Sequence, residues 1–302
     1  MSIKLENISY VYSPGTAYEH HALKDVSLEI PQGQFVGIIG HTGSGKSTLI
    51  QHLNGLMKAT SGKLIYEGQN IYEDGYDMKK LRTQVGLVFQ YPEYQLFEVD
   101  VLSDVCFGPK NQGLDRRDVE LRAFEALRNV GFPEELFYQP PFDLSGGQKR
   151  RVAIAGVLAM KPDVLILDEP TAGLDPNERI RFRNLISELS ENRLVLLSTH
   201  IVSDIEYIAN EIMLMKDGML CYTGTAEELL ASMQEHVWLC QVPRNMVENY
   251  MRKYLVGNIK TSENGAELRI ISKEKPMAEA VLTEKNLEDA FLLYFGEKSE
   301  ER

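Results

Sequence analysis

A glycine-rich segment that ends in lysine and serine has the residue types and spacing needed to bind phosphate. It consists of Gly40, His41, Thr42, Gly43, Ser44, Gly45, Lys46 and Ser47, followed by Thr48, and matches the pattern G-x-x-x-x-G-K-[ST]. Glycines let backbone N–H groups converge on a phosphate without Cβ clashes, and the start of a following helix adds a favourable dipole. In such a loop the lysine reaches the β- and γ-phosphates, and the serine hydroxyl ligates Mg²⁺. The segment therefore predicts a site for ATP and Mg²⁺ rather than an ordinary turn.

Two adjacent carboxylates end an apolar run farther along the chain. Val164–Leu167 precedes Asp168 and Glu169. A buried strand would bring Asp168 to the phosphate loop, where it can hold Mg²⁺ directly or through water. Glu169 would then polarise the attacking water as a general base. A charged turn after a core strand is the alternative, and the presence of the phosphate loop argues against it.

A serine and two glycines at the start of a helical segment form a second candidate anion site. The residues are Leu144, Ser145, Gly146, Gly147 and Gln148, and a helix that begins in this way presents free N–H groups to an anion. This segment resembles the signature motif of the ATPase subunits of ATP-binding-cassette transporters. The resemblance implies that the motif caps the γ-phosphate of ATP bound to the opposite subunit. We therefore expect a head-to-tail dimer in which each chain supplies two half-sites.

The same resemblance assigns roles to four further residues. Tyr12 would stack on adenine, Gln90 would sense Mg²⁺ and the membrane partner, Asp175 would communicate across the dimer, and His200 would contact the γ-phosphate. Without the resemblance, the alternatives are a strand aromatic for Tyr12 and structural roles for Gln90 and His200.

The predicted site combines catalytic, metal-binding and nucleotide-binding residues. The predicted catalytic residues are Glu169, His200, Lys46 and Gln90, and the predicted Mg²⁺ ligands are Ser47, Gln90 and Asp168. The predicted nucleotide-binding residues are Tyr12, Gly40, His41, Thr42, Gly43, Ser44, Gly45, Lys46, Ser47, Thr48, Gln90, Ser145, Gly146, Gly147, Gln148 and Asp175.

Two parts of the chain resemble different transporters. Residues 1–170 resemble the ATPase of energy-coupling-factor importers, which serve vitamin and metal-ion uptake; the resemblance lies in Tyr10–Thr16, Gln90–Phe97, Phe107–Asn111 and Gln148–Met160. Residues 178–302 resemble the ATPases of two-subunit multidrug-type exporters, in Glu178–Gly218 and Asn286–Phe291. We predict the importer type, with integral membrane subunits and a sister ATPase in a heterodimer as partners. The exporter type is the alternative.

The segment after Gln90 is where the family docks a helix of its membrane subunit. Leu96, Phe97 and Val99 lie there among acidic residues. Apolar side chains in this setting can line a groove for a helix. Inward packing at the edge of a helical subdomain is the alternative.

Alternation and apolar runs predict the elements that position these residues. Strands are expected at 3–12, Ala22–Ile30, Gln34–Ile39, Val85–Phe89, Val164–Leu167 and Leu194–Ser198, and helices at Ser47–Leu56, Arg116–Val130, Gly147–Met160, Asn177–Leu189 and Val202–Asn210. Alternating strands and helices predict an α/β fold. The resemblance specifies a phosphate-loop nucleotide-binding domain with an antiparallel β portion and a helical signature subdomain at about 95–160.

A change in composition near Ala231 predicts a second domain. Strands are expected at Val237–Val242 and Glu267–Ser272, helices at Asn245–Tyr254 and Leu287–Phe295, a turn at 262–265 and a frayed charged end at 297–302. The predicted domains are therefore an ATPase domain at 1–231 and a small α+β appendage at 232–302.

Composition limits the partners. A net charge of −12 and a pI of about 5.1 argue against nucleic-acid binding, which favours a basic surface. Apolar runs such as Leu194–Leu197 are far shorter than the roughly 20 residues of a membrane helix. We expect a peripheral protein at the cytoplasmic face of the membrane, held there only by its partners.

Two other classes of protein are the remaining alternatives. A soluble cassette ATPase of translation or DNA repair usually has two cassettes or a long coiled coil, and neither is evident. A non-catalytic ATP-binding module is disfavoured because Glu169 and His200 are both present.

Overall fold

The computed structural model describes residues 2–31, 33–190, 193–262 and 265–296. The predicted charged end at 297–302 and the middle of the predicted turn at 262–265 lie outside these residues. The chain forms two compact units, Met1–Cys221 and Tyr222–Arg302. This boundary lies inside strand β10 (Met219–Gly224), ahead of the position predicted from composition at 231/232.

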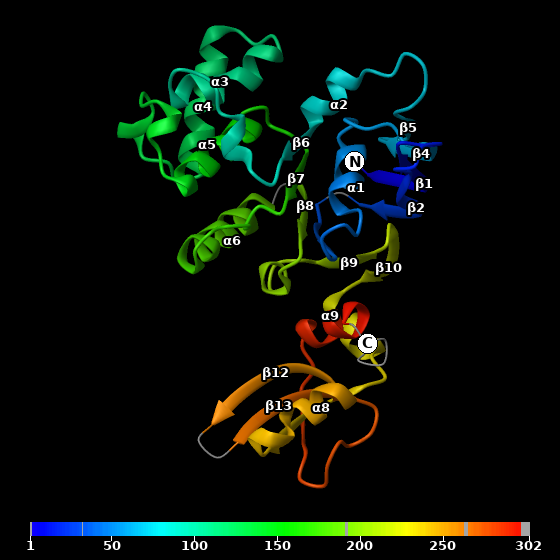
Figure 1. Ribbon diagram of the computed structural model, residues 1–302. Helices are drawn as coiled ribbons and strands as arrows, with labels where there is room; N and C mark the ends of the chain where they lie inside the picture. Colours follow the sequence, from blue (N-terminus) through cyan, green and yellow to red (C-terminus); the bar gives the residue numbers. More distant parts are fainter. Residues whose placement is uncertain (1, 32, 191–192, 263–264, 297–302) are drawn as a thin grey trace. The chain divides into compact units, whose positions relative to one another are not determined.

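The first unit begins with an antiparallel sheet in the order β2-β1-β4-β5 (Figure 1). Its strands are β1 (Ile3–Tyr12), β2 (His20–Ile30), β4 (Ser61–Tyr66) and β5 (Gln69–Asn70). β1 pairs antiparallel with both β2 and β4, and Tyr12 lies opposite His20. The alternation of apolar residues predicted β1 and β2 correctly, and the antiparallel portion is present.

The centre of the unit is a six-stranded sheet in the order β10-β9-β3-β8-β7-β6. Besides β10, it contains β3 (Phe35–Ile39), β6 (Val85–Val88), β7 (Val164–Asp168), β8 (Leu194–Thr199) and β9 (Glu211–Lys216). The strands from β9 to β6 run parallel, and every residue of β3, β6, β7 and β8 is buried, as expected for continuous apolar runs. Because parallel strands end at one edge, the residues that follow β3, β7 and β8 are brought together there.

Helices lie around this sheet, and three of them form a separate cluster. The helices near the sheet are α1 (Lys46–Leu53), α2 (Met78–Gln84) and α6 (Pro176–Ser190). The cluster consists of α3 (Val101–Asn111), α4 (Arg116–Asn129) and α5 (Gly146–Leu158), which pack on one another (Figure 1). The short 3₁₀ turns η1 (Pro92–Gln95), η2 (Glu134–Leu136) and η3 (Pro141–Asp143) adjoin it. These elements occupy the range predicted for the helical subdomain.

The helix predicted at Val202–Asn210 is wrong. Only the 3₁₀ turn η4 (Val202–Asp204) forms, and turns follow it. The reason is tertiary: the fully buried carboxylate of Asp204 accepts hydrogen bonds from the hydroxyls of Thr171 and Thr199. Tertiary contacts of this kind override a local helix propensity.

The second unit is an α+β structure around a sheet in the order β12-β13-β11-β14. Its elements are α7 (Ala226–Ser232), β11 (His236–Val242), η5 (Arg244–Met246), α8 (Val247–Lys253), β12 (Leu255–Ser262), β13 (Gly265–Ser272), β14 (Val281–Thr283) and α9 (Leu287–Phe295). Cys240, Leu268 and Ile270 form its core, with Tyr250 of α8 packed against them. Arg269 and the buried Asp289 form an ion pair at 2.6 Å. The sequence predicted β11, β13, α8 and α9 but not β12 or β14.

Candidate active site

A pocket of about 280 Å³ brings most of the predicted site residues together. It is lined by Tyr12, His20, Ala22, Thr42, Gly43, Gly45, Lys46, Ser47, Thr48, Gln90, Glu169 and His200. The phosphate loop follows β3, Glu169 follows β7, and His200 follows β8. The parallel sheet is therefore the reason that residues more than a hundred positions apart share one pocket.

Three glycines shape the loop in different ways. A Cβ on Gly40 would overlap the carbonyl oxygen of Met215, so the loop packs too closely there for a side chain. Gly45 has a φ of +101° and packs against the carbonyl of Ala22. Gly43 has a φ of +83° with open space at its Cβ position. Since left-handed backbone favours glycine, the pattern of glycines follows from the loop's shape.

Lys46, Glu169 and His200 form a continuous set of contacts. Lys46 Nζ donates hydrogen bonds to the carbonyls of Gly40 at 2.8 Å and His41 at 3.0 Å. It also lies 3.2 Å from Oε1 of Glu169. The other Glu169 oxygen, Oε2, lies 2.6 Å from Nδ1 of His200. Three of the four predicted catalytic residues are therefore directly connected, and the fourth, Gln90, lines the same pocket.

Glu169 is held in an uncommon backbone conformation. Its φ of +47° lies in the left-handed region, which costs energy for a residue other than glycine and recurs at functional sites. Its N–H donates to the carbonyl of Ser198 at 3.0 Å and to the Ser198 hydroxyl at 3.2 Å. These bonds to β8 hold the Glu169 backbone in place at the end of β7.

Asp168 is buried beside the loop and bonded to two hydroxyls. Ser198 Oγ donates to Asp168 Oδ1 at 2.6 Å, and the side chain of Ser47 also hydrogen-bonds this carboxyl. Burial raises the pKa of Asp168 above its ordinary value, while the hydrogen bonds from Ser198 and Ser47 oppose this increase. Sequence analysis missed Ser198, although it lies opposite Asp168 in the parallel register of β7 and β8.

The oxygen atoms of this site fit a magnesium ion. Ser47, Asp168 and Gln90 carry hard oxygen atoms of the kind that Mg²⁺ prefers. In the described part of the chain, no group of three or more His, Cys, Asp or Glu side chains forms a metal cage. Since Mg²⁺ typically uses one or two protein ligands together with phosphate and water, this sparse set is appropriate.

Tyr12 lines the pocket, with His20 opposite it on β2. The Tyr12 hydroxyl is 3.2 Å from Thr48 Oγ1, and its ring packs edge-on against Tyr10 at 4.9 Å between centroids. His20 and Ala22 also line the pocket. Sequence analysis assigned neither residue, because their placement depends on a β1–β2 register that several irregularities interrupt.

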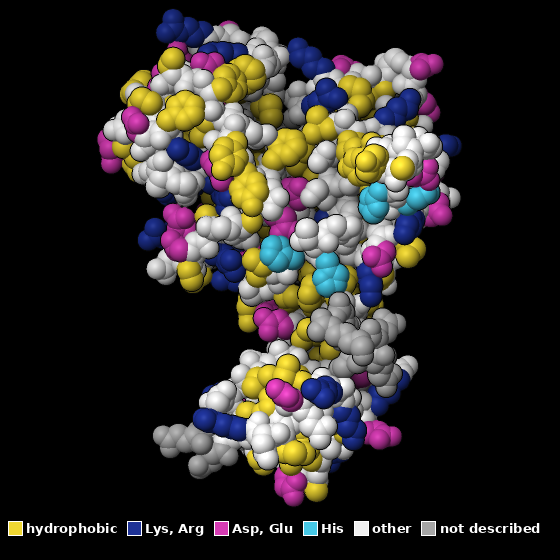
Figure 2. All heavy atoms as spheres, viewed as in Figure 1, with side chains coloured by type: hydrophobic (Ala, Val, Ile, Leu, Met, Phe, Trp, Pro, Cys, Tyr) yellow, Lys and Arg dark blue, Asp and Glu magenta, His cyan; other side chains and the backbone are white. Residues whose placement is uncertain are grey.

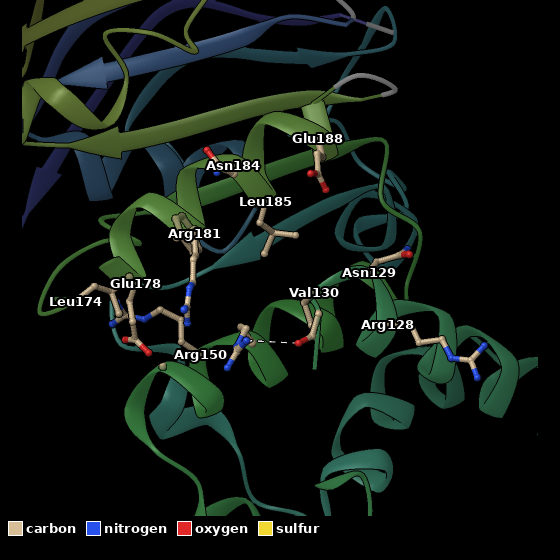
Figure 3. A pocket seen from close by; sticks show the side chains of 14 residues that line it. Arg128, Asn129, Val130, Arg150, Leu174, Glu178, Arg181, Asn184, Leu185 and Glu188 are labelled. Carbon is tan, nitrogen blue, oxygen red and sulfur yellow. Dashed lines mark hydrogen bonds between the residues drawn. The ribbon is translucent and has the colours of Figure 1, made fainter. Parts of the chain in front are cut away.

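The predicted signature residues and Asp175 do not line this pocket. Ser145 and Gln148 form a capping box at the start of α5, and Asp175 accepts a hydrogen bond from the Glu178 N–H at 2.9 Å. Gly147 instead lines a separate cavity of about 460 Å³ with residues of α4 and α6 (Figure 3). Within one chain, the structure thus holds the signature residues apart from the phosphate loop.

The apolar segment after Gln90 divides between core and surface. Leu96 is buried, as inward packing predicts, whereas Phe97 and Val99 are exposed, as a docking surface predicts. Phe97 packs edge-on against the partly exposed Phe107 of α3, with 4.9 Å between ring centroids. Inward packing is therefore confirmed for Leu96, and docking at Phe97 and Val99 stays a prediction.

A model of the family described as ABC transporter matches residues 23–172. The chain is 52% identical to the energy-coupling factor transporter ATP-binding protein EcfA2 of Caldanaerobacter subterraneus subsp. tengcongensis over 231 residues, which are 76% of this chain and 81% of that protein. The importer-like resemblance was predicted for residues 1–170 only. Because 231 residues align with this EcfA2 protein, the similarity to it extends beyond residue 170.

Solved structures of ABC transporter proteins also resemble this chain. The chain is similar to cbiO1 from Clostridium perfringens, part of the ABC transporter complex cbiONQ, with 39% identity, a TM-score of 0.69 and coverage of 76% of this chain and 90% of that one. It is also similar to the ATP-binding cassette MJ0796, in a dimeric post-hydrolysis state bound to ADP and Pi, with 30% identity, a TM-score of 0.67 and coverage of 74% and 98%. In the residues that the structure describes, we find no helix with the length and apolar character of a membrane span. The chain belongs to the ABC transporter family as an ATP-binding, ATP-hydrolysing subunit of a membrane transporter.

Proposed function

We propose that this chain hydrolyses Mg·ATP in the pocket at the end of β3, β7 and β8. The observation that carries the proposal is the connected set Lys46–Glu169–His200, with Asp168 and Ser47 beside it. Lys46 binds the β- and γ-phosphates, and Glu169 accepts a proton from the attacking water. His200 orients Glu169 through its 2.6 Å contact and faces the γ-phosphate.

Binding of ATP requires Lys46 to change partners. Lys46 is only 5% exposed at its side chain and is paired with Glu169, so the phosphates compete with this carboxylate for one ammonium group. Once Lys46 turns to the phosphates, Glu169 is released to act on water. A bound Mg²⁺, held by Ser47, Gln90 and Asp168, would neutralise charge on the phosphate oxygens.

The second half of the site comes from another subunit. Ser145, Gly146, Gly147 and Gln148 begin α5, whose N-terminal N–H groups suit a phosphate. They lie outside the pocket of their own chain. A head-to-tail dimer would place them against the ATP of the partner, with Asp175 at the junction. The numbered name EcfA2 of the relatives supports a sister ATPase as that partner, in a heterodimer.

We propose that this ATP drives the uptake of vitamins or metal ions, as the resemblance to energy-coupling-factor importers implies; the name of the EcfA2 relatives supports this transporter type. The proposal places the chain at the cytoplasmic face of the membrane, where integral subunits hold it. Exposed Tyr94, Phe97, Val99 and Phe107 provide an apolar surface for a membrane subunit's helix. Figure 2 shows apolar side chains exposed over the α3–α5 part of one face.

Two measurements test the proposed function. Phosphate release from ATP should require Mg²⁺ and stop when EDTA removes it; release without any divalent ion would contradict the assignment of Ser47, Gln90 and Asp168. Isolation of the full-length chain from membranes should recover a second ATPase and integral subunits of the importer type. Recovery of an exporter permease alone would instead establish the ATPase of a multidrug-type exporter.

A further inference from the structure

Arg150 is a buried cation in the second turn of the signature helix α5. It is 4% exposed, and burying a guanidinium is costly unless hydrogen bonds compensate. It does not line the nucleotide pocket, so binding ATP does not explain it. Figure 3 shows Arg150 near Leu174 and Glu178 at one end of the larger cavity.

The guanidinium joins α5 to two other segments of the site. Nη1 donates to the carbonyl of Pro170 at 2.9 Å and to that of Ala172 at 2.9 Å, so it holds the residues that directly follow Glu169. Nη2 lies 3.4 Å from the carbonyl of Gln90 and 3.5 Å from Oε2 of Glu93. One side chain therefore contacts both the segment that leads to Asp175 and the segment that contains Gln90.

The two sets of bonds differ in strength. At 2.9 Å, the bonds to Pro170 and Ala172 have ordinary hydrogen-bond length, whereas the contacts to Gln90 and Glu93 are at the limit. The planar fork of arginine is suited to several acceptors in fixed directions, which a lysine ammonium cannot reproduce. The geometry thus gives α5 a firm link to the segment after Glu169 and a looser link to the segment of Gln90.

We propose that Arg150 is a positioning residue that transmits the position of the Gln90 segment to the signature helix and to the segment after Glu169, a role that rests on the proposed ATP hydrolysis. When a membrane subunit or ATP moves Gln90, the guanidinium adjusts and carries α5 with it. Arg150 acts on turnover and not on the affinity of the chain's own phosphate loop for ATP.

The test compares variants of this chain within the complex isolated from membranes, which contains its partner ATPase and the integral subunits. Arg150→Met removes the link, Arg150→Lys keeps the charge without the fork, and Glu93→Ala removes only the contact on the Gln90 side. Arg128→Met is the matched control, because Arg128 forms an exposed surface pair with Glu134 at 2.8 Å. The readouts are kcat per bound nucleotide, KM, the Kd of a fluorescent ATP analogue, and Tm.

Arg150→Met should lower kcat per bound nucleotide roughly 10- to 100-fold, the loss expected when reacting groups are misplaced by about 1 Å. Its nucleotide Kd should stay within about twofold of wild type, which is less than a 0.5 kcal/mol change. Arg150→Lys should retain part of the wild-type kcat. The double variant Glu93→Ala/Arg150→Met should have the same kcat as Arg150→Met alone. Arg128→Met should behave as wild type.

An unchanged kcat in Arg150→Met, or a kcat loss fully matched by a loss of bound nucleotide, overturns the positioning role. If the Met variant does not fold, Arg150→Lys decides by the same criteria, and wild-type kcat in it is the contradicting result. Failure of wild type itself to release phosphate would contradict the proposed ATP hydrolysis instead, so the two failures are distinguishable.

Discussion

Nζ of Lys46 lies 3.2 Å from Oε1 of Glu169, so the predicted phosphate ligand and the predicted base form a buried ion pair. Neither side chain is more than 10% exposed. A buried pair is expensive to break without a replacement partner. In the proposed function, ATP supplies that replacement for Lys46, and the binding of nucleotide is thereby linked to the release of Glu169.

Lys46→Ala should raise the Kd for ATP roughly 10- to 100-fold, because a hydrogen bond to a charged group contributes about 1.5–3 kcal/mol. Titration with a fluorescent ATP analogue measures this. Lys58→Ala is the control, since Lys58 is exposed and outside the pocket. Wild-type affinity in Lys46→Ala would contradict the role given to Lys46.

His200→Ala should lower kcat by about 10²-fold, at the lower end of the contribution of general acid–base groups. The reason is that His200 Nδ1 contacts Glu169 Oε2 at 2.6 Å, so its loss leaves the base free to turn. Steady-state phosphate release gives kcat, with His236→Ala in the second unit as control. An increase in KM with an unchanged kcat would show that His200 binds ATP without orienting the base.

Asp168→Asn should stabilise the nucleotide-free protein at neutral pH while ending Mg²⁺-dependent hydrolysis. Burial raises the pKa of Asp168 above the ordinary value of 3.8, so folding favours the protonated carboxyl relative to the unfolded chain. The contribution of this carboxyl to the free energy of unfolding is fully present below pH 3.8, and it is lost as the pH rises through the raised pKa. Because asparagine does not ionise, the variant does not lose stability in this pH range.

Thermal melting without nucleotide or Mg²⁺ measures the effect of Asp168→Asn. The Tm of the variant should exceed that of wild type by roughly 2–4 °C for each kcal/mol relieved, and the difference should shrink as pH falls toward 4. Exposed Asp74 provides the control variant, Asp74→Asn. A lower Tm of Asp168→Asn at pH 7 would contradict the inferred cost of ionising Asp168.

Arg269→Met should destabilise the second unit by about 3 kcal/mol, since removing one partner leaves Asp289 as an unpaired buried charge. Limited proteolysis should cut residues 222–302 faster than in wild type. Arg252→Met is the control, because its pair with Glu248 is highly exposed. Equal cleavage of Arg269→Met and wild type would show that the ion pair contributes little.

The sequence predicted those parts of the site that short-range patterns determine. The phosphate loop, Asp168, Glu169 and the strands before them depend on glycine spacing and apolar runs, and the structure forms them. Ser198 and His20 depend on the pairing of β8 with β7 and of β2 with β1. No local pattern reveals such a register, so their places in the site appear only in three dimensions.

The incorrect helix at Val202–Asn210 has the same origin. The local spacing of its apolar residues favours a helix. The buried Asp204, however, accepts hydrogen bonds from Thr171, which is distant in the sequence, and from Thr199 at the end of β8. β12 was missed for a different reason: its residues from Gly257 to Ser262 are exposed, so no apolar alternation marks them. Local sequence patterns therefore failed where tertiary hydrogen bonds decide the structure and where a strand is exposed to solvent.

The most direct test of the account is hydrolysis by Glu169→Gln, with Glu188→Gln, an exposed position on α6, as control. The amide keeps the size of the side chain but cannot accept the proton of the attacking water. We predict that the variant binds ATP with at least wild-type affinity while kcat falls roughly 10²- to 10⁴-fold. Turnover equal to that of wild type would contradict the assignment of Glu169 as the base.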